Sequence, residues 1–420
     1  MQTSNSPVTM SAASFGKLRV QINSLQDGKP IEGAMIQISS TGLPDKVLDE
    51  TTSNNHGQIT PIELPAPPFE YSQEPFANQP YSEYNFKISA PGFEPIEINS
   101  AEILPDETAI QNVQLTPTIK PETAELYVID PHTLYAQYPP KIAEPEVKLV
   151  PEGGEIVLSQ VVIPEYVVVH NGPPSDTSAK NYYERYRDYI KNVASSEIYA
   201  TWPESSLQAN ILAIMSFTLN RVFTEWYRNK GFNFTITSST AYDHKWIPNR
   251  NIFESIDTVV DELFTNYLSR PSIIQPILTQ YCDGKNVTCP NWMSQWGSKS
   301  LGDQGYPAID ILRNFYGNSI FINTTDEVSG VPSSWPKANL SVGSTGDKVR
   351  QMQSQLNTIS NSYPLIPKIT ADGAYGPKTE EAVKVFQSVF GLPQTGVVDF
   401  KTWYKISEVY VAVSRIAELV

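Results

Sequence analysis

The chain of 420 residues lacks several features that would assign it to common classes of protein. It contains no run of 18 or more apolar residues, so no membrane-spanning helix is expected. Lysine and arginine number 30 against 45 aspartate and glutamate, which gives a formal net charge of −15. Nucleic-acid binding relies on cationic side chains that displace counterions from phosphates. We therefore predict neither a membrane span nor a nucleic-acid partner.

Cysteine and histidine are also scarce, with two and four residues respectively. Cys282 and Cys289 stand in "CDGKNVTC". This pair can close a small disulfide loop, remain as thiols or supply half of a zinc site. With so few histidines a complete metal site is difficult to assemble. We favour the disulfide or the thiol pair over metal, and we predict no metal and no other cofactor.

What the chain does contain indicates a folded protein of several domains. Its length exceeds a single ordinary core, and its 34 prolines are typical of linkers and β-rich structure. Over residues 15–116, short runs alternate apolar and polar residues between Gly and Pro turns, which predicts an all-β sandwich. "GKPIEGAMIQI", "SNNHGQI" and "YNFKISAPGFEP" resemble the transthyretin-like, carboxypeptidase-regulatory type of sandwich. Such modules are spacers, adhesive units or chaperoning segments, so no chemistry is assigned to it.

Residues 117–151 contain seven prolines and mixed charge. They predict an extended, semi-rigid linker with a short strand near "ELYVI". Exposed connectors of this kind are where proteases cut. A second linker, "SGVPSSWPKANL", precedes the last 80 residues.

The region 152–328 mixes strands with strong helices, which predicts an α+β fold. Apolar residues at helical spacing lead up to Glu197, and a second helix is expected to open with a capping box, Thr201-Trp-Pro-Glu204. Glu197 is thus predicted to lie in the turn between two helices. On spacing alone, a lone glutamate there is most often a surface residue or a cap.

Two separated motifs in this region resemble the SpoIID/LytB domain. "YRDYIKNVASSEIYATWPESSLQANILAIMSFTLNR" is similar to its opening segment, and "MSQWGSKSLGDQGYPAIDILRNFYGNSI" to its closing segment. Between them, "ITSSTAYDHKW" corresponds to its polar strand, with His244 where glutamine is common. The chain departs from the family again at Met215-Ser216-Phe217, where Ala-Arg-Thr is frequent.

The resemblance implies cleavage of peptidoglycan glycan strands by a lytic transglycosylase route, with Glu197 as the catalytic acid. One carboxyl group suffices when the C6 hydroxyl of the muramic acid attacks C1 of the same sugar. Burial against Tyr199 and Trp202 is expected to raise the pKa of Glu197. Two alternatives stay open: a non-catalytic wall-binding protein or amidase enhancer, and a hydrolytic muramidase with Asp243 as the second carboxylate.

Other polar residues of these motifs are candidates to bind acetamido and hydroxyl groups of the substrate or to hold Glu197 in place. They are Ser195, Ser196, Ser239, Thr240, Tyr242 and Asp243. Gln295 and Trp296 are candidates to line the cleft, since aromatic faces suit sugar rings. Each of these residues, taken singly, is equally compatible with an ordinary cap, strand or core position.

Residues 338–415 contain three segments that closely resemble the three-helix type of peptidoglycan-binding domain: "LSVGSTGDKVRQMQSQLN", "DGAYGPKTEEAVKVFQSVFGL" and "TGVVDFKTWYKI". Val349, Met352 and Leu356 form one apolar helix stripe, and Ala382, Val383 and Phe386 form another. Asp372, Tyr375 and Gln387 are the candidate ligand contacts. Such a module raises the local concentration of a neighbouring domain at an insoluble polymer.

The order of these four regions resembles the SleC-like family of spore cortex-lytic enzymes. The resemblance implies a zymogen that a serine protease cleaves near the N-terminal connector during germination, with the first region as a pro-region. The first 20 residues lack a basic start followed by an apolar run, so no conventional signal peptide is expected. That expectation fits a protein made in the mother cell and held in the cortex and coat region of the spore.

Overall fold

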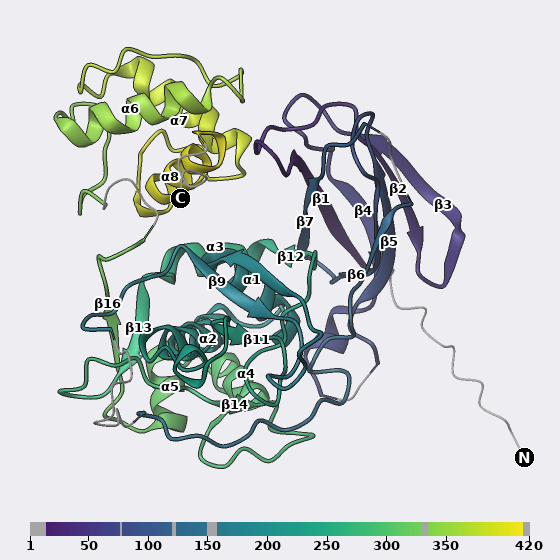
Figure 1. Ribbon diagram of the computed structural model, residues 1–420, viewed down its shortest axis with the longest axis vertical. Coiled ribbons are helices and arrows are strands. Elements are labelled where there is room, and N and C mark those ends of the chain that lie inside the picture. Colours follow the sequence, from purple (N-terminus) through teal and green to yellow (C-terminus); the bar gives the residue numbers. More distant parts are fainter. Residues whose placement is uncertain (1–13, 76–77, 120–122, 149–157, 330–334, 415–420) are drawn as a thin grey trace, which may run out of the picture.

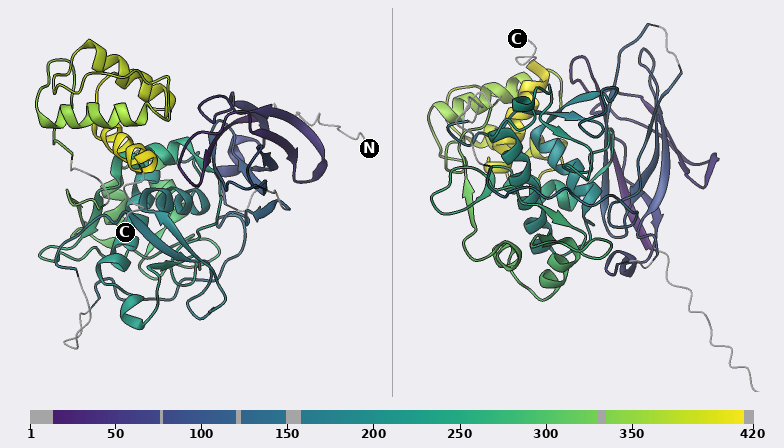
Figure 2. Two further views of the ribbon diagram at one scale, coloured as in Figure 1. Left: turned by 45° about the horizontal axis from the view of Figure 1, so that its top comes forward. Right: turned by 60° about the horizontal axis from the view of Figure 1, so that its bottom comes forward.

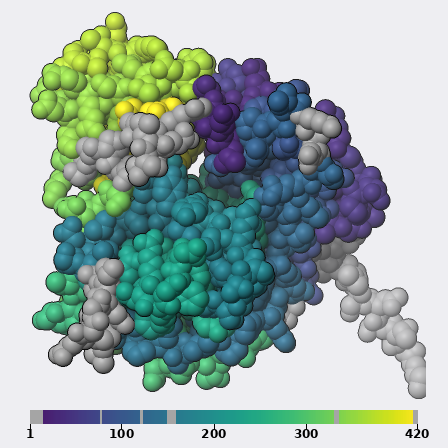
Figure 3. Space-filling model, in the orientation of Figure 1, coloured from purple at the N-terminus to yellow at the C-terminus, as the bar shows by residue number. Residues whose placement is uncertain are grey.

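The computed structural model describes residues 14–75, 78–119, 123–148, 158–329 and 335–414. The chain is multidomain, with a β-rich N-terminal region, a central region of helices and short strands, and a C-terminal group of helices (Figure 1). The N-terminal and C-terminal regions lie beside each other over the central region (Figure 3). Gln58 of the first donates a hydrogen bond to the carbonyl oxygen of Val389 in the last, at 2.7 Å.

Two sheets form the N-terminal region. The larger has the strand order β3-β2-β5-β6-β8 and the smaller the order β12-β7-β1-β4. Their bounds are β1 Ser14–Ser24, β2 Met35–Ser40, β3 Leu43–Thr52, β4 Ile62–Ala66, β5 Ser82–Ser89, β6 Ile96–Ile103, β7 Thr108–Leu115, β8 Glu125–Val128 and β12 Ile252–Phe253, with the short helix η1 at Phe69–Ser72. Leu18, Val20 and Ile22 alternate along β1 and are buried, so the predicted alternation is confirmed there.

Two of these strands come from outside the predicted sandwich at 15–116. β8 pairs in parallel with β6, and β12 pairs antiparallel with β7 through Ile252↔Ile110 and Phe253↔Ala109. An edge strand presents unpaired N–H and C=O groups, and later segments of the chain satisfy them here. The N-terminal sheets are therefore completed by the connector and by the central region.

The central region surrounds the helix α2 (Glu204–Phe223), which is buried on nearly every side and contacts α1, α3, α4 and α5 (Figure 1). In the left view of Figure 2, the C-terminal helices lie above the teal helices of this region. Most of the buried side chains of α2 are apolar, and its buried polar side chains are hydrogen-bonded, as Asn210 is to the Ser206 oxygen at 2.8 Å. The neighbouring helices are α1 Tyr186–Glu197, α3 Glu254–Leu263, α4 Gln295–Asp303 and α5 Ala308–Tyr316, with the short helix η2 at Arg228–Lys230. Short strands complete the region: β9 Tyr166–His170, β10 Asn181–Arg185, β11 Ile236–Thr237, β13 Asn266–Ser269, β14 Tyr281–Cys282, β15 Met293–Ser294 and β16 Phe321–Thr324.

The predicted capping box at the start of α2 is wrong. The N-cap position is Pro203, and no side chain caps the helix. The hydroxyl of Thr201 instead donates a hydrogen bond to the hydroxyl oxygen of Ser72, at 2.7 Å. The Thr201 side chain, which the local pattern assigned to the N-terminus of α2, is therefore bonded to the N-terminal region.

Three helices form the C-terminal region, as predicted: α6 (Asp347–Ile359), α7 (Pro377–Val389) and α8 (Phe400–Ser414). Both predicted apolar stripes, on α6 and on α7, are buried between the helices. Residue 415, the predicted end of this region, lies outside the described residues. Over the described ranges, none of the helices is both long and apolar enough to cross a membrane.

The short strand predicted near "ELYVI" in the connector is confirmed as β8 (Glu125–Val128). Residues 120–122 and 149–151 of the connector, residues 152–157 of the predicted central region, and 330–334 of the second linker lie outside the described residues. Residues 130–148 run along the central region and bond to it, as in Ile142 N–H to the Ala241 oxygen at 2.7 Å and Leu278 N–H to the Glu146 oxygen at 2.8 Å. We call residues 130–148 the strap. This part of the connector is therefore bound to the surface of the central region.

Candidate active site around Glu197

Glu197 is the last residue of α1, where the chain leaves the helix in an extended conformation at Ile198. Its side chain is buried, with 2% of the residue exposed. One carboxylate oxygen, Oε1, accepts a hydrogen bond from the backbone N–H of Lys245 at 2.6 Å, and Oε2 accepts one from the hydroxyl of Tyr281. The sequence predicted this residue in the turn between two helices; the structure places it one step earlier, at the end of the first helix.

Burial dominates the electrostatics of this carboxyl group. Loss of solvent raises the pKa of Glu197 above its ordinary value, although the charge of Lys141 and the bonds from Tyr281 and Lys245 favour the ionised form. A carboxyl group with a raised pKa keeps its proton closer to neutral pH. Glu197 can therefore serve as a general acid.

A small cavity of about 60 Å³ lies beside Glu197. It has three walls: the strap, the loop after β14, and residues of the central region. The residues that line it are Thr133, Ala136, Tyr138, Pro139, Pro140, Lys141, Glu197, Thr240, Tyr281, Cys282, Asp283, Asn286, Val287 and Gln295. Gln295 also donates a hydrogen bond to the backbone oxygen of Glu197, at 2.9 Å.

The loop after β14 is closed by a disulfide between Cys282 and Cys289, the first of the alternatives favoured from the sequence. Within the loop, the Asp283 carboxylate accepts hydrogen bonds from the backbone N–H groups of Lys285, Asn286 and Val287, at 2.9 to 3.1 Å. This wall of the cavity is thus rigid, and the Asp283 carboxylate is engaged in shaping it.

The strap brings a cation to the cavity. The Lys141 ammonium donates to the backbone oxygen of Asp243 and lies 4.7 Å from the centre of the Tyr281 ring. Burial lowers the pKa of Lys141, while the charges of Glu197 and Asp243 act in the opposite direction. Among the groups that favour the ionised form of Glu197, Lys141 has the largest effect. The strap therefore both covers the carboxyl group and opposes its protonation.

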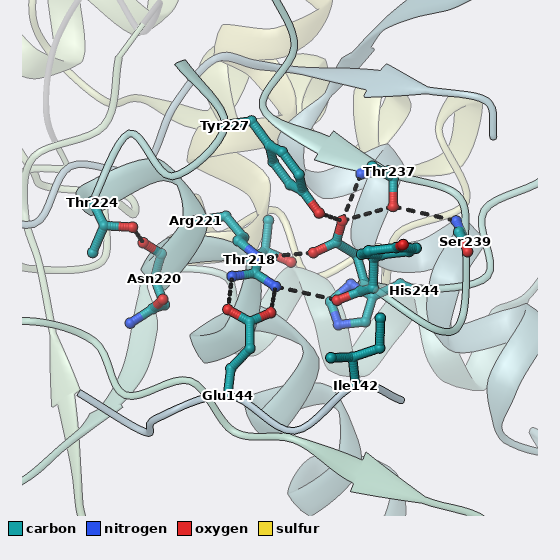
Figure 4. Close-up of polar contacts among 12 residues, drawn as sticks. Ile142, Glu144, Thr218, Asn220, Arg221, Thr224, Tyr227, Thr237, Ser239 and His244 are labelled. Carbon is teal, nitrogen blue, oxygen red and sulfur yellow. Dashed lines mark hydrogen bonds and ion pairs between the residues drawn. The ribbon is translucent and has the colours of Figure 1, made fainter. Parts of the chain in front are cut away.

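Asp243 is not among the residues that line the cavity. It belongs to a polar cluster with Arg221, Tyr227 and Thr237, which Figure 4 labels. Its Oδ1 accepts a hydrogen bond from Nε of Arg221 at 2.7 Å. Its Oδ2 accepts from the Tyr227 hydroxyl at 2.7 Å and from the N–H and hydroxyl of Thr237 at 2.9 and 2.7 Å. Arg221 in turn binds both carboxylate oxygens of Glu144 in the strap, at 3.0 and 2.6 Å. Four donors occupy the acceptor sites of this carboxylate, so Asp243 holds structure together.

The structure brings together only some of the predicted site residues. Thr240 and Gln295 line the cavity with Glu197. Ser195 and Ser196 are fully buried behind the turn, and the Ser196 hydroxyl donates to the backbone oxygen of Asn192 at 2.9 Å. These two serines offer no surface to a sugar in this conformation.

Three further predicted residues, Ser239, Tyr242 and Trp296, are not among the residues that line the cavity. The backbone oxygen of Ser239 accepts the N–H groups of Tyr242 and Asp243, at 3.0 and 2.8 Å. Trp296 is buried, with its ring 5.0 Å from that of Trp202 and 6.1 Å from that of Tyr199. The prediction that Trp296 lines the cleft is corrected, because aromatic packing draws its ring into the core.

The sequence interpretation did not find Tyr281, Lys141 or Lys245 as neighbours of Glu197. Tyr281 directly precedes Cys282 and carries no pattern of its own, and Lys141 lies in a segment without periodicity. His244 was noted, and it is fully buried with Nδ1 3.0 Å from the Tyr189 hydroxyl oxygen. The centres of the His244 and Tyr281 rings are 5.9 Å apart, and the angle between the ring planes is 10°. His244 therefore supports the tyrosine from behind.

The predicted ligand residues of the C-terminal region hold its loops. The Tyr375 hydroxyl donates to the Gly396 oxygen at 2.8 Å, and Gln387 bonds to the same glycine's N–H at 2.9 Å. Both residues are buried, at 2% and 1% exposure, so the prediction that they contact ligand is wrong for this conformation. Asp372 is exposed, although its carboxylate caps the N–H of Ala374 at 2.9 Å.

Comparison with known proteins identifies one region. A family model of a peptidoglycan binding domain matches residues 345–406, so the C-terminal region is a peptidoglycan-binding domain and associates the chain with the cell wall. No curated protein matches the chain.

Solved structures similar to this chain cover about a quarter of it. They include the Bacillus anthracis TIE protein (16% identity, 25% of this chain and 17% of that chain, TM-score 0.18) and GBS52, the minor pilin of Streptococcus agalactiae (13%, 27% and 49%, 0.18). A third is 5-hydroxyisourate hydrolase of Klebsiella pneumoniae, with 16% identity over 24% of this chain and 90% of that chain, and a TM-score of 0.17. The chain thus spans about a sixth of the first of these proteins and half of the second. At these TM-scores the likenesses support no inference.

Proposed function

We propose that this protein cleaves the glycan strands of peptidoglycan by a lytic transglycosylase reaction, with Glu197 as its acid and spore cortex as its substrate. The observation that carries the proposal is a buried glutamate with a raised pKa on the wall of a cavity, in a chain that also has a peptidoglycan-binding domain. The peptidoglycan-binding domain attaches the chain to the polymer, and Glu197 of the central region supplies the proton.

The proposed chemistry uses one carboxyl group twice. Glu197 gives its proton to the glycosidic oxygen as the bond from that oxygen to C1 of the muramic acid breaks. The C6 hydroxyl of the same sugar then forms a bond to C1, and its proton passes to the Glu197 carboxylate. Because the nucleophile belongs to the substrate, the reaction has the advantage of an intramolecular attack. The Tyr281 hydroxyl and the Lys245 N–H stabilise the carboxylate between the two proton transfers.

Hydrolysis is the less supported chemistry because it needs a second available carboxylate. Asp243, the candidate from the sequence, is saturated by Arg221, Tyr227 and Thr237. Among the described residues that line the cavity, the other carboxylate is Asp283, which caps its own loop.

We further propose that the described chain is a zymogen, activated by a serine protease that cuts the connector during germination. A cavity of about 60 Å³ is small beside the roughly 300–1,000 Å³ of ordinary ligand pockets. The strap supplies the wall from Thr133 to Lys141, and two ion pairs, Glu144–Arg221 and Glu146–Arg270, tie it down. Displacement of the strap would open the site and remove the Lys141 charge from Glu197.

One observation favours a second function: in this structure the strap covers Glu197, which is buried. If the strap never leaves, the covered Glu197 cannot reach a glycan, and the protein would bind peptidoglycan without cutting it or would assist an amidase. The location proposed for either function is the cortex and coat region of the spore.

The deciding experiment compares intact and connector-cut protein on purified cortex and on vegetative sacculi, with products identified by mass spectrometry. Wild type, Glu197→Gln and a control, Glu204→Gln, are tested. Glu204 follows the same turn but bonds only to Gln208 among the contacts described. We expect 1,6-anhydromuramic ends from cut wild type and cut Glu204→Gln, and none from cut Glu197→Gln.

Other outcomes would contradict parts of the proposal. Equal rates for intact and cut protein would refute the zymogen. Reducing ends in place of anhydro ends would replace the lytic route with hydrolysis. Binding to cortex without any soluble fragment, before and after the cut, would favour the non-catalytic function.

A further inference from the structure

The back of the Glu197 turn rests on a buried arginine. The Arg250 side chain has no exposed surface, and its Nη2 donates a hydrogen bond to the backbone oxygen of Ser195, two residues before Glu197. The same nitrogen donates to the carboxylate of Glu102. Glu102 lies on β6 in the N-terminal sheets, 148 positions away in the sequence. One guanidinium group thus joins the N-terminal region to the segment that carries the acid.

Neighbouring bonds fix this arginine in place. The side-chain amide of Asn251 accepts the N–H of Glu102 at 3.1 Å and donates to the oxygen of Glu102 at 2.8 Å. Gln111 of β7 donates to the backbone oxygen of Asn249 at 3.0 Å. Directly after Asn251, β12 joins the smaller sheet beside β7. The segment that carries Arg250 is therefore anchored to the N-terminal sheets on both of its sides.

The N-terminal region also holds the other end of the turn. Nε1 of Trp202 donates to the backbone oxygen of Ser72 at 3.0 Å, and the Thr201 hydroxyl bonds to the Ser72 hydroxyl. Glu197 thus lies between two residues, Ser195 and Trp202, that are each hydrogen-bonded to a group that the N-terminal region provides or orients. Catalytic groups need their position fixed closely, because small displacements of a proton donor lower the rate steeply.

We propose that Arg250, oriented by Glu102, is a positioning residue for Glu197. On this proposal the N-terminal sheets stay bound after the connector is cut and are a working part of the catalytic unit, unlike the detachable pro-region expected from the sequence. This proposal rests on the function proposed above. Buried ion pairs add little net stability compared with apolar residues of the same volume. Their retention here is explained by the single geometry that they impose on the Ser195 carbonyl.

The test uses the full chain with its connector cut, on soluble glycan fragments. The variant Arg250→Met/Glu102→Gln removes both charges together, so that neither is left buried alone. We expect kcat to fall at least tenfold with KM within about twofold of wild type, and the conservative Arg250→Lys to retain an intermediate kcat. The matched control is Arg19→Met/Glu254→Gln, which breaks another ion pair between the N-terminal sheets and the central region, at 2.7 Å, without touching the turn. Its kcat should equal that of wild type.

A second readout separates this proposal from the proposed function. The ¹³C resonance of the Glu197 carboxyl, assigned by difference with Glu197→Gln, should shift in the double variant and stay in place in the control. If wild type releases no glycan fragments, the function fails while this shift still decides the positioning role. A folded double variant with wild-type kcat, or with an unmoved Glu197 resonance where there is no activity, would overturn the proposal. Should the double variant fail to fold, Arg250→Lys alone decides by the same readouts.

Discussion

The surroundings of Glu197 and of Asp243 differ in almost every respect, although both are buried carboxyl groups of the central region. Asp243 receives four hydrogen bonds, one of them from the guanidinium of Arg221. Glu197 receives two, from a hydroxyl and a backbone N–H, and it borders a cavity. The comparison teaches that burial alone does not mark an acid. A buried carboxyl group is free for chemistry when its neighbours leave it able to carry a proton.

The largest expected effect is on catalysis at Glu197. Glu197→Gln keeps the size of the side chain and removes the transferable proton, and a positioned general acid contributes about 10²- to 10⁴-fold to a rate. We expect a loss of that order in kcat for connector-cut protein, measured by release of soluble glycan. Circular dichroism should show an unchanged fold. A variant that keeps more than a tenth of wild-type kcat would remove Glu197 from its role.

The next effect is on stability at Asp243. Asp243→Asn leaves the buried Arg221 short of a charged partner, and breaking a buried ion pair costs about 3–5 kcal/mol. We expect a loss of this size in the free energy of unfolding, measured with urea. Asp303→Asn is the control, because it breaks the partly exposed pair with Lys299, worth at most about 1 kcal/mol. Equal stability of the two variants would show that the Arg221 cluster is no anchor.

A smaller effect is expected at Tyr281. Tyr281→Phe removes a hydrogen bond that favours the ionised form of Glu197, while Lys141 and Lys245 still face the carboxyl group. The pKa of Glu197 should therefore rise further. Because the acid acts in its protonated form, the alkaline limb of the pH–rate profile should move to higher pH, with kcat lower by about tenfold. A shift of that limb to lower pH would contradict the assigned role of the hydroxyl.

Much of the fold follows from patterns within single segments. The helical spacing before Glu197, the alternation along β1 and the stripes of α6 and α7 each predict their elements, because each records which face is buried. The position of Glu197 near the end of a helix follows for the same reason.

Contacts between distant segments were not predictable in this way. The Thr201 hydroxyl bonds to Ser72 and does not cap its own helix. Strand β12 extends an N-terminal sheet, and Lys141 of the proline-rich connector lines the cavity. No local periodicity records such partners. The neighbours that shift the pKa of Glu197, namely Lys141, Tyr281 and Lys245, therefore became visible only in three dimensions.

The most direct test of the account is a pH titration of the Glu197 carboxyl in the intact chain, followed by its ¹³C resonance and assigned with Glu197→Gln. Among the described residues no cation forms an ion pair with this buried carboxyl group, so we expect its pKa to lie above that of an ordinary glutamate. A titration at or below that ordinary value would contradict the assignment of Glu197 as the acid.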